Sequence, residues 1–98
     1  MSIVRLGINE SVLIETPTGG IELRVQEIEG TKNNKRGKIQ IKGSPFVQQD
    51  SLVELTNSEV LQLAPNLGVR VADFSSGYRL RLYFVNPEYY RIHIQRQL

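Results

Sequence analysis

Cysteine is absent from this chain of 98 residues, and histidine occurs only once, at His93. Without cysteine the chain has neither a disulfide framework nor a thiolate metal site. A cytoplasmic setting, or a virion if the chain is phage-encoded, therefore fits better than a secreted one. One histidine and dispersed carboxylates do not give the ligand spacing of a metal site. We expect no metal ion and no cofactor.

Long hydrophobic runs are also missing. No apolar stretch approaches the roughly 20 residues of a membrane span, and the N-terminus lacks the basic-then-apolar order of a signal peptide. We therefore expect no targeting segment and no membrane partner. Gly19-Gly20 leads into an expected strand without the lysine and serine of a phosphate-binding loop. His93 has no evident partner with which to activate a nucleophile, so we expect a protein that is not an enzyme.

The formal charge of +2 is too small to indicate nucleic-acid binding by itself, because phosphate binding depends on clustered charge. Two clusters are present. Lysines and arginines gather between residues 32 and 38, and arginines recur between residues 70 and 96. Each cluster fits a phosphate-facing patch, and each equally fits a solvated hairpin tip or strand face.

Short segments of alternating apolar and polar residues dominate the first half. The pattern predicts strands over residues 2–6, 11–15, 21–28, 38–42 and 52–55. We expect the first two to form a hairpin. Residues 30–37 should be an exposed loop, and Gly43-Ser44-Pro45 should end the pairing. The fold class is mainly β, a small antiparallel sheet or barrel-like module forming one domain over residues 1–98.

The middle of the chain is ambiguous. Residues 56–59, Thr-Asn-Ser-Glu, resemble a helix N-cap with an acid in the first turn, which favours one short helix near 58–64. Residues 60–63 also fit a short strand. The pattern alone does not decide between the two.

The last third predicts a three-stranded meander over residues 69–74, 78–85 and 89–95. A turn at residues 86–88 would place Leu82 opposite Ile92 in the core. The same register would align Tyr83 with Arg91 and Arg81 with His93 on the other face. We therefore expect a surface of basic and aromatic side chains on these late strands.

The sequence contains a weak internal repeat. Residues 2–6, Ser-Ile-Val-Arg-Leu, resemble residues 51–55, Ser-Leu-Val-Glu-Leu, and residues 11–13 resemble residues 59–61. A duplication would make the chain a covalently linked pseudo-dimer. Recurrence of Val, Leu and Ser at strand starts produces such matches as well.

Several segments together resemble the carbon storage regulator (CsrA) family. The order and spacing match from residue 3 to residue 60, with insertions at 31–36 and 46–50, and residues 1–66 form the similar part. Residues 67–98 are an extension without a family counterpart. The segments that carry the resemblance are residues 8–14, INESVLI; 21–30, IELRVQEIEG; 38–45, KIQIKGSP; and 53–55, VEL.

The resemblance implies an intertwined homodimer that binds GGA-bearing RNA loops and regulates translation. The family's first-strand site falls at residues 4–7, and its last-strand site includes Val53, Leu55 and residues 56, 57 and 59. The family has arginines where this chain has Leu6, Gly7 and Asn57, and these residues do not reproduce the planar donor fork of arginine. Only Arg5, displaced by one place, supplies a cation there.

Two hypotheses follow. The first is a diverged RNA-binding regulator of this type, a homo-oligomer that contacts phosphate through arginines and stacks a base on tyrosine. The second is a structural or assembly protein, such as a phage virion component, whose strands contact other proteins. The candidate nucleic-acid-binding residues are Arg5, Lys35, Arg36, Arg79, Arg81, Tyr83, Arg91 and His93.

Overall fold

In the computed structural model, the alternating segments form nine β-strands within the described part of the chain. The structure describes residues 2–17, 19–31, 34–48, 51–72, 79–85 and 90–95, and this part of the chain contains no helix. The strands are β1 (Ser2–Leu6), β2 (Ser11–Thr16), β3 (Gly19–Thr31), β4 (Asn34–Lys42), β5 (Ser51–Leu55), β6 (Leu61–Ala64), β7 (Leu67–Val71), β8 (Leu80–Val85) and β9 (Arg91–Gln95).

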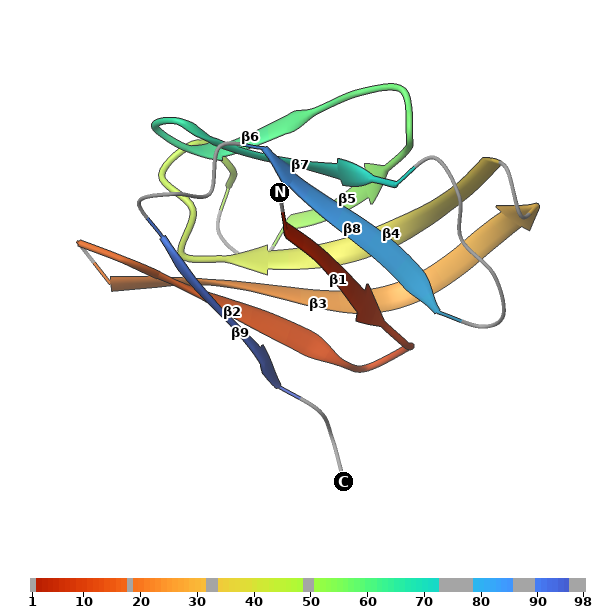
Figure 1. Cartoon of the computed structure of the whole chain (residues 1–98), viewed down its shortest axis with the longest axis horizontal. Helices are drawn as coiled ribbons and strands as arrows, with labels where there is room; N and C mark the ends of the chain where they lie inside the picture. Colours follow the sequence, from red (N-terminus) through yellow and green to blue (C-terminus); the bar gives the residue numbers. More distant parts are fainter. Residues whose placement is uncertain are drawn as a thin grey trace.

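The strands form two antiparallel sheets that pack face to face (Figure 1). One sheet has four strands in the order β1-β8-β7-β6, and the other has five in the order β5-β4-β3-β2-β9. The mainly-β prediction is confirmed. Both sheets bury one face and expose the other, as the alternating sequence pattern requires.

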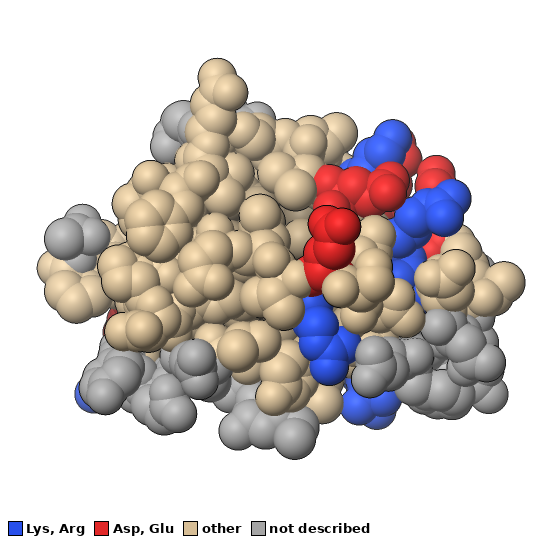
Figure 2. Space-filling view, turned by 90° about the horizontal axis from the view of Figure 1, so that it is seen from above, with Lys and Arg blue, Asp and Glu red and all other residues tan. Residues whose placement is uncertain are grey.

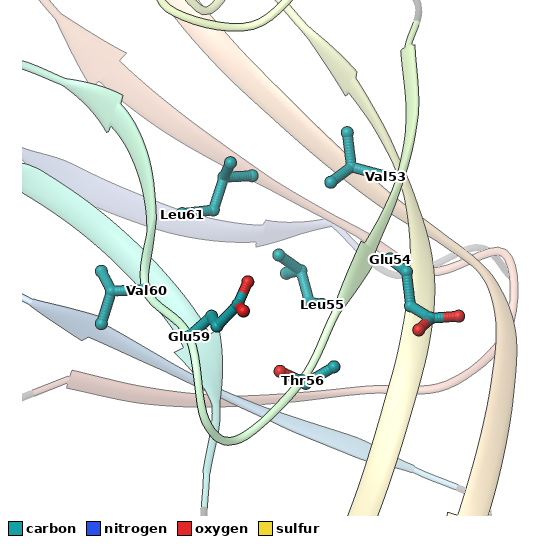
Figure 3. Close-up of a pocket in the computed structure, with 7 residues that line it drawn as sticks. All are labelled: Val53, Glu54, Leu55, Thr56, Glu59, Val60 and Leu61. Carbon is teal, nitrogen blue, oxygen red and sulfur yellow. The ribbon is translucent and has the colours of Figure 1, made fainter.

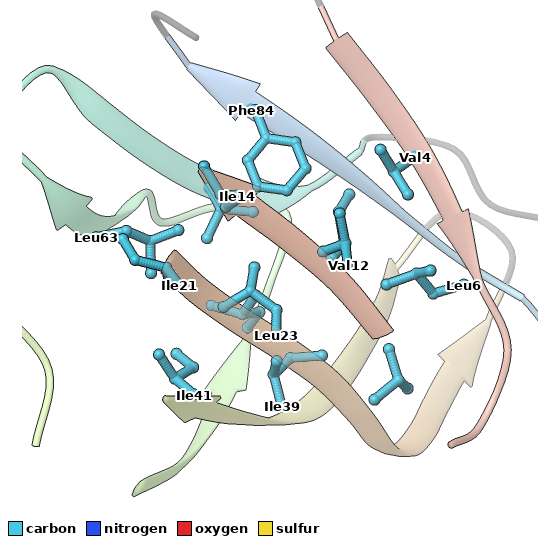
Figure 4. Close-up of a cluster of buried hydrophobic side chains, with 14 of the residues drawn as sticks. Val4, Leu6, Val12, Ile14, Ile21, Leu23, Ile39, Ile41, Leu63 and Phe84 are labelled. Atoms are coloured by element: carbon cyan, nitrogen blue, oxygen red, sulfur yellow. The ribbon is translucent and has the colours of Figure 1, made fainter. Parts of the chain in front are cut away.

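Apolar side chains from both sheets fill the space between them (Figure 4). Leu6 and Phe84 from one sheet and Leu23 and Ile39 from the other are fully buried. Burying a side chain of this size stabilises the fold by about 1.5–3 kcal/mol. This shared core holds the two sheets together.

The predicted hairpin between the first two strands is wrong, because β1 pairs with β8 while β2 pairs with β3 and β9. The turn after β1 sends the chain across to the other sheet. Glu10 accepts a hydrogen bond from the Gly7 amide, Asn9 has a φ of 68°, and the Asn9 amide donates to the Val25 carbonyl at 2.8 Å. These bonds tie the turn to β3.

Residues 58–64 do not form the expected helix, since residues 61–64 are strand β6. The strand pairs with β7 through a turn at Pro65 and Asn66, where Asn66 has a φ of 61°. Pairing with β7 buries Leu63 completely between the sheets. This packing outweighs the local capping signal, which instead serves a turn at residues 56–58.

The expected loop at residues 30–37 is wrong in most of its length. Strands β3 and β4 continue their ladder as far as Thr31 and Asn34, with an irregularity between Val25 and Glu27. The residues here are polar, which is typical of a loop, but polar side chains also fit a strand pair that is exposed to solvent. The end of β4 at Lys42 is as expected, and Gly43 follows it with a φ of 86°.

Only the first half of the predicted C-terminal meander is confirmed. Strands β7 and β8 pair, but β9 joins the other sheet beside β2, where Ile92 lies opposite Ile14. The predicted pairing of Leu82 with Ile92 is therefore wrong, and so is the common face for Arg81 and His93. The turn expected at residues 86–88 lies outside the described residues.

The two sheets repeat the same arrangement. If β1 to β4 are replaced by β5 to β8 and vice versa, the order β1-β8-β7-β6 becomes β5-β4-β3-β2, which is the order of the other sheet without β9. Each first strand therefore completes the sheet made by the other half. The chain has the topology of a strand-exchanged pair of modules linked in one polypeptide.

The pairing registers also coincide. Val4 lies opposite Leu82, and Val53 lies opposite Ile39. The predicted match between residues 2–6 and 51–55 thus reflects equivalent positions, whereas the second match is displaced by one residue. Equivalent core positions are held by Val4 and Val53, Leu6 and Leu55, Val12 and Leu61, Ile21 and Leu67, Leu23 and Val69, Val25 and Val71, Ile39 and Leu82, and Ile41 and Phe84.

One equivalent pair breaks this likeness and yields a prediction. Gly37 stands where the other half has Leu80, and a Cβ at Gly37 would lie 2.5 Å from a methyl of Leu80, which is fully buried. We expect Gly37→Ala to lower the free energy of unfolding by about 1–3 kcal/mol, measured by denaturant titration. Gly68→Ala is the matched control, because the side chain that it meets, Val60, is 49% exposed and able to move. Equal effects of the two substitutions would contradict this account.

Strand exchange makes a second prediction. Residues 1–48 lack the partner of β1, and residues 51–98 lack the partner of β5. Neither half should give a folded monomer, whereas the two mixed together should recover the β-rich fold, as measured by circular dichroism and light scattering. A folded, monomeric half would refute the exchange.

Candidate nucleic-acid interface

Three arginines and a tyrosine project from the outer side of the four-stranded sheet. They are Arg5 of β1, Arg70 of β7, and Arg81 and Tyr83 of β8, and we call them the arginine face. Buried neighbours in each strand point inward, so these four side chains point outward. The described outward residues of these strands include no acid. The sheet therefore presents a basic surface with one aromatic ring.

Arg5 and Arg81 occupy directly opposite positions in the β1–β8 ladder. Side chains in this relation have Cβ atoms about 4.5–5.5 Å apart, and like charges placed there destabilise the sheet. The arrangement therefore places two forked donors side by side, where one anion can contact both.

Arg70 lies opposite Tyr83 in the neighbouring ladder, and its guanidinium carbon is 4.9 Å from the centre of the tyrosine ring. This is a cation–π contact. Arg70 Nη1 also donates a hydrogen bond of 3.0 Å to the Val71 carbonyl, which fixes the guanidinium plane. The pair is a flat, positively charged platform at the centre of the sheet.

Arg79, another predicted site residue, is held differently. Its Nη1 lies 2.6 Å from Glu10 Oε1, and the same oxygen accepts the Gly7 amide. This ion pair joins the start of β8 to the turn after β1. Arg79 is thus a positioning residue at the rim of the arginine face, and its charge is largely neutralised.

The remaining predicted residues lie elsewhere. Arg91 and His93 are on β9 in the five-stranded sheet, where His93 Nε2 is 3.3 Å from a Glu15 oxygen. Lys35 and Arg36 are on the β3–β4 hairpin, where Arg36 Nε is 3.4 Å from Glu29. The structure therefore brings together Arg5, Arg81 and Tyr83 from the predicted set and separates the others from them.

Arg70 was missing from the predicted site. The alternation of Val69, Arg70 and Val71 places the arginine on the face opposite the core, and the β7–β8 pairing was expected from sequence. Combining the two observations would have set Arg70 beside Tyr83. The predicted pairing of β8 with β9, which is wrong, places Tyr83 beside Arg91 instead.

The outer side of the five-stranded sheet has a different character. Lys38 Nζ is 3.6 Å from Glu27, and Arg24 Nη2 is 3.9 Å from Glu22. Seen from above, basic and acidic residues interleave at the end of the molecule that carries the β3–β4 hairpin (Figure 2). Charges of opposite sign neutralise one another here, so this side is a poor phosphate-binding surface.

Equivalent positions on the two sheets make this contrast direct. The place of the Arg5–Arg81 pair is taken in the other sheet by Glu54 opposite Lys38. The place of the Arg70–Tyr83 pair is taken by Arg24 opposite Gln40. One scaffold therefore carries a basic, aromatic face on one side and a neutral, polar face on the other.

Pockets elsewhere offer little chemistry. The neutral face has a shallow pocket of about 410 Å³ lined by Gln26, Glu27, Gln40 and Leu52. Among the described residues, no group of three or more His, Cys, Asp or Glu side chains is placed to hold a metal ion. The arginine face is thus the strongest candidate site.

Comparison with known proteins gives no match to any family model, curated protein or solved structure. The resemblance to the carbon storage regulator family stays a prediction from the sequence.

Proposed function

We propose that this chain binds single-stranded RNA on the arginine face and, as its resemblance to the carbon storage regulator family implies, regulates translation. The observation that carries the proposal is the Arg5–Arg81 pair. The equivalent place on the other sheet holds an acid opposite a base, which is the favourable combination. The Arg5–Arg81 pair instead sets two cationic, forked donors side by side, where one anion can contact both.

A phosphate group is the natural anion for this pair. Each guanidinium presents a planar fork of donors that matches phosphate oxygens, and two such forks bracket one phosphate or two successive ones. Charge-assisted hydrogen bonds of this type contribute about 1.5–3 kcal/mol each. A phosphate of the bound RNA backbone would place a negative charge between Arg5 and Arg81 and so offset their mutual repulsion.

The Arg70–Tyr83 platform supports the choice of a single strand. Unpaired bases stack on aromatic rings and on guanidinium planes, and each stacked base contributes about 1–3 kcal/mol. Bases in a duplex are already stacked on each other and do not reach such a platform. Both elements of the site come from one chain, so binding does not require the predicted homo-oligomer.

Substitution of Arg5 or Arg81 by alanine tests the proposal. We expect each to weaken binding of a labelled single-stranded RNA oligonucleotide about tenfold or more, because charged contacts to phosphate are lost. Fluorescence anisotropy at about 50 and about 200 mM salt should show the salt slope reduced by about 0.7 for each phosphate contact removed.

Arg36→Ala is the matched control, since it removes an arginine that is paired with Glu29 on the distant hairpin. Its affinity for RNA should equal that of the unsubstituted chain. Arg91→Ala serves the same purpose on β9. Loss of binding in these controls but not in Arg5→Ala would overturn the site, and no binding at micromolar protein in low salt would favour the assembly role instead.

The repulsion between Arg5 and Arg81 gives a separate prediction about stability. Arg5→Gln should raise the free energy of unfolding by about 0.2–1 kcal/mol at low salt, although it weakens RNA binding. The gain should shrink at high salt, where the repulsion is screened. Glu54→Gln is the control at the equivalent place, and it should not stabilise, because Glu54 faces Lys38. A destabilising Arg5→Gln would show that Arg5 serves the fold rather than a ligand.

A further inference from the structure

The two sheets differ at one edge. In the five-stranded sheet, β9 pairs with the outer side of β2. Strand β6 stands at the equivalent place in the four-stranded sheet, and none of the described strands pairs with its outer side. The scaffold therefore has a place for a tenth strand beside β6.

Burial confirms that this place is uncovered. Val12 of β2 is fully buried, whereas its equivalent on β6, Leu61, is only partly buried. Val53 of β5 is likewise partly buried where its equivalent, Val4, is 6% exposed. Val60, just before β6, is 49% exposed. Apolar groups that are covered in one half remain accessible in the other.

These groups line a pocket of about 130 Å³ between β5 and the start of β6 (Figure 3). Val53, Leu55 and Leu61 make its apolar wall, and the Glu59 carboxylate turns toward this wall, whereas the Glu54 carboxylate points away from it. At the far end of β6, Ser44 Oγ donates a hydrogen bond to the Leu63 carbonyl and so closes that end of the edge. The accessible stretch is the part of β6 nearest the pocket.

Strand β9 indicates what would fit. Its register sets Ile92 opposite Ile14 and Ile94 opposite Val12, while Arg91 and His93 alternate with them. A strand with this alternation would cover the apolar wall with one face. Its polar residues would point away from the wall, as Arg91 and His93 alternate with the isoleucines on β9.

We propose that the edge of β6 binds an extended segment of another protein in which β-branched residues alternate with polar ones, as they do on β9. The segment would add an antiparallel strand to the four-stranded sheet, so that backbone hydrogen bonds give affinity and the apolar wall gives selectivity. This inference does not depend on RNA binding, because the pocket shares no residue with the arginine face.

A labelled peptide with the sequence of residues 90–97, YRIHIQRQ, is a direct probe, because it carries the pattern of β9. We expect saturable binding to the intact chain by fluorescence anisotropy at peptide concentrations up to about 1 mM. The same peptide with proline in place of Ile92 should fail to bind, because proline does not sustain strand pairing.

Two matched variants locate the binding. Val53→Lys places an ammonium in the apolar wall and should weaken peptide binding about tenfold or more. Leu52→Lys adds the same charge to the next residue of β5, which is 57% exposed and faces the other way, and it should bind normally. Val60→Lys, at an exposed position of the pocket, repeats the test if Val53→Lys does not fold.

Each other outcome overturns the proposal. Peptide binding that survives both Val53→Lys and Val60→Lys would place the peptide elsewhere, for example on β2 in exchange for β9. Absence of saturable binding would leave no role for the edge. Self-association of the intact chain that Val53→Lys abolishes would assign the edge to a second copy rather than to another protein.

Discussion

The exchange of first strands is the constraint on which the rest of the structure depends. Strand β1 completes the sheet of β6 to β8, and β5 completes the sheet of β2 to β4, so neither sheet is finished by its own half of the chain. The exchanged strands both contribute to the shared core, in which Leu6 and Leu55 occupy equivalent positions. Folding of each half is therefore coupled to folding of the other.

The same exchange builds the arginine face. Arg5 comes from the first half of the sequence and Arg81 from the second, and they meet because β1 crosses to the opposite sheet. Glu10, in the crossing turn, binds both the Gly7 amide and Arg79, and thereby joins the turn after β1 to the start of β8. The geometry of the proposed site is thus a consequence of topology rather than of a local motif.

Local pattern predicted the strands well and their partners poorly. Alternation located β1, β2 and β5 within a residue or two, because each buries one face. It placed β1 beside β2 and β9 beside β8, because proximity in sequence is the only pairing signal that a single chain offers. The helix near residues 58–64 failed for a related reason: Leu63 is buried by contacts with residues distant in sequence. Residue type alone indicated Arg5, Arg81 and Tyr83. The order of strands in the sheet is needed to place Arg70 on the same face.

A linked pair of modules has a freedom that two identical chains lack. In a symmetric dimer every substitution occurs twice, so a like-charge pair such as Arg5 and Arg81 would be present in both sheets. In this chain the equivalent place holds Glu54 and Lys38, and the repulsion is confined to one face. The same independence lets β9 cover one edge while the edge of β6 stays accessible. The difference between the halves therefore allows one scaffold to carry both the proposed nucleic-acid face and the proposed strand-binding edge, each on one sheet only.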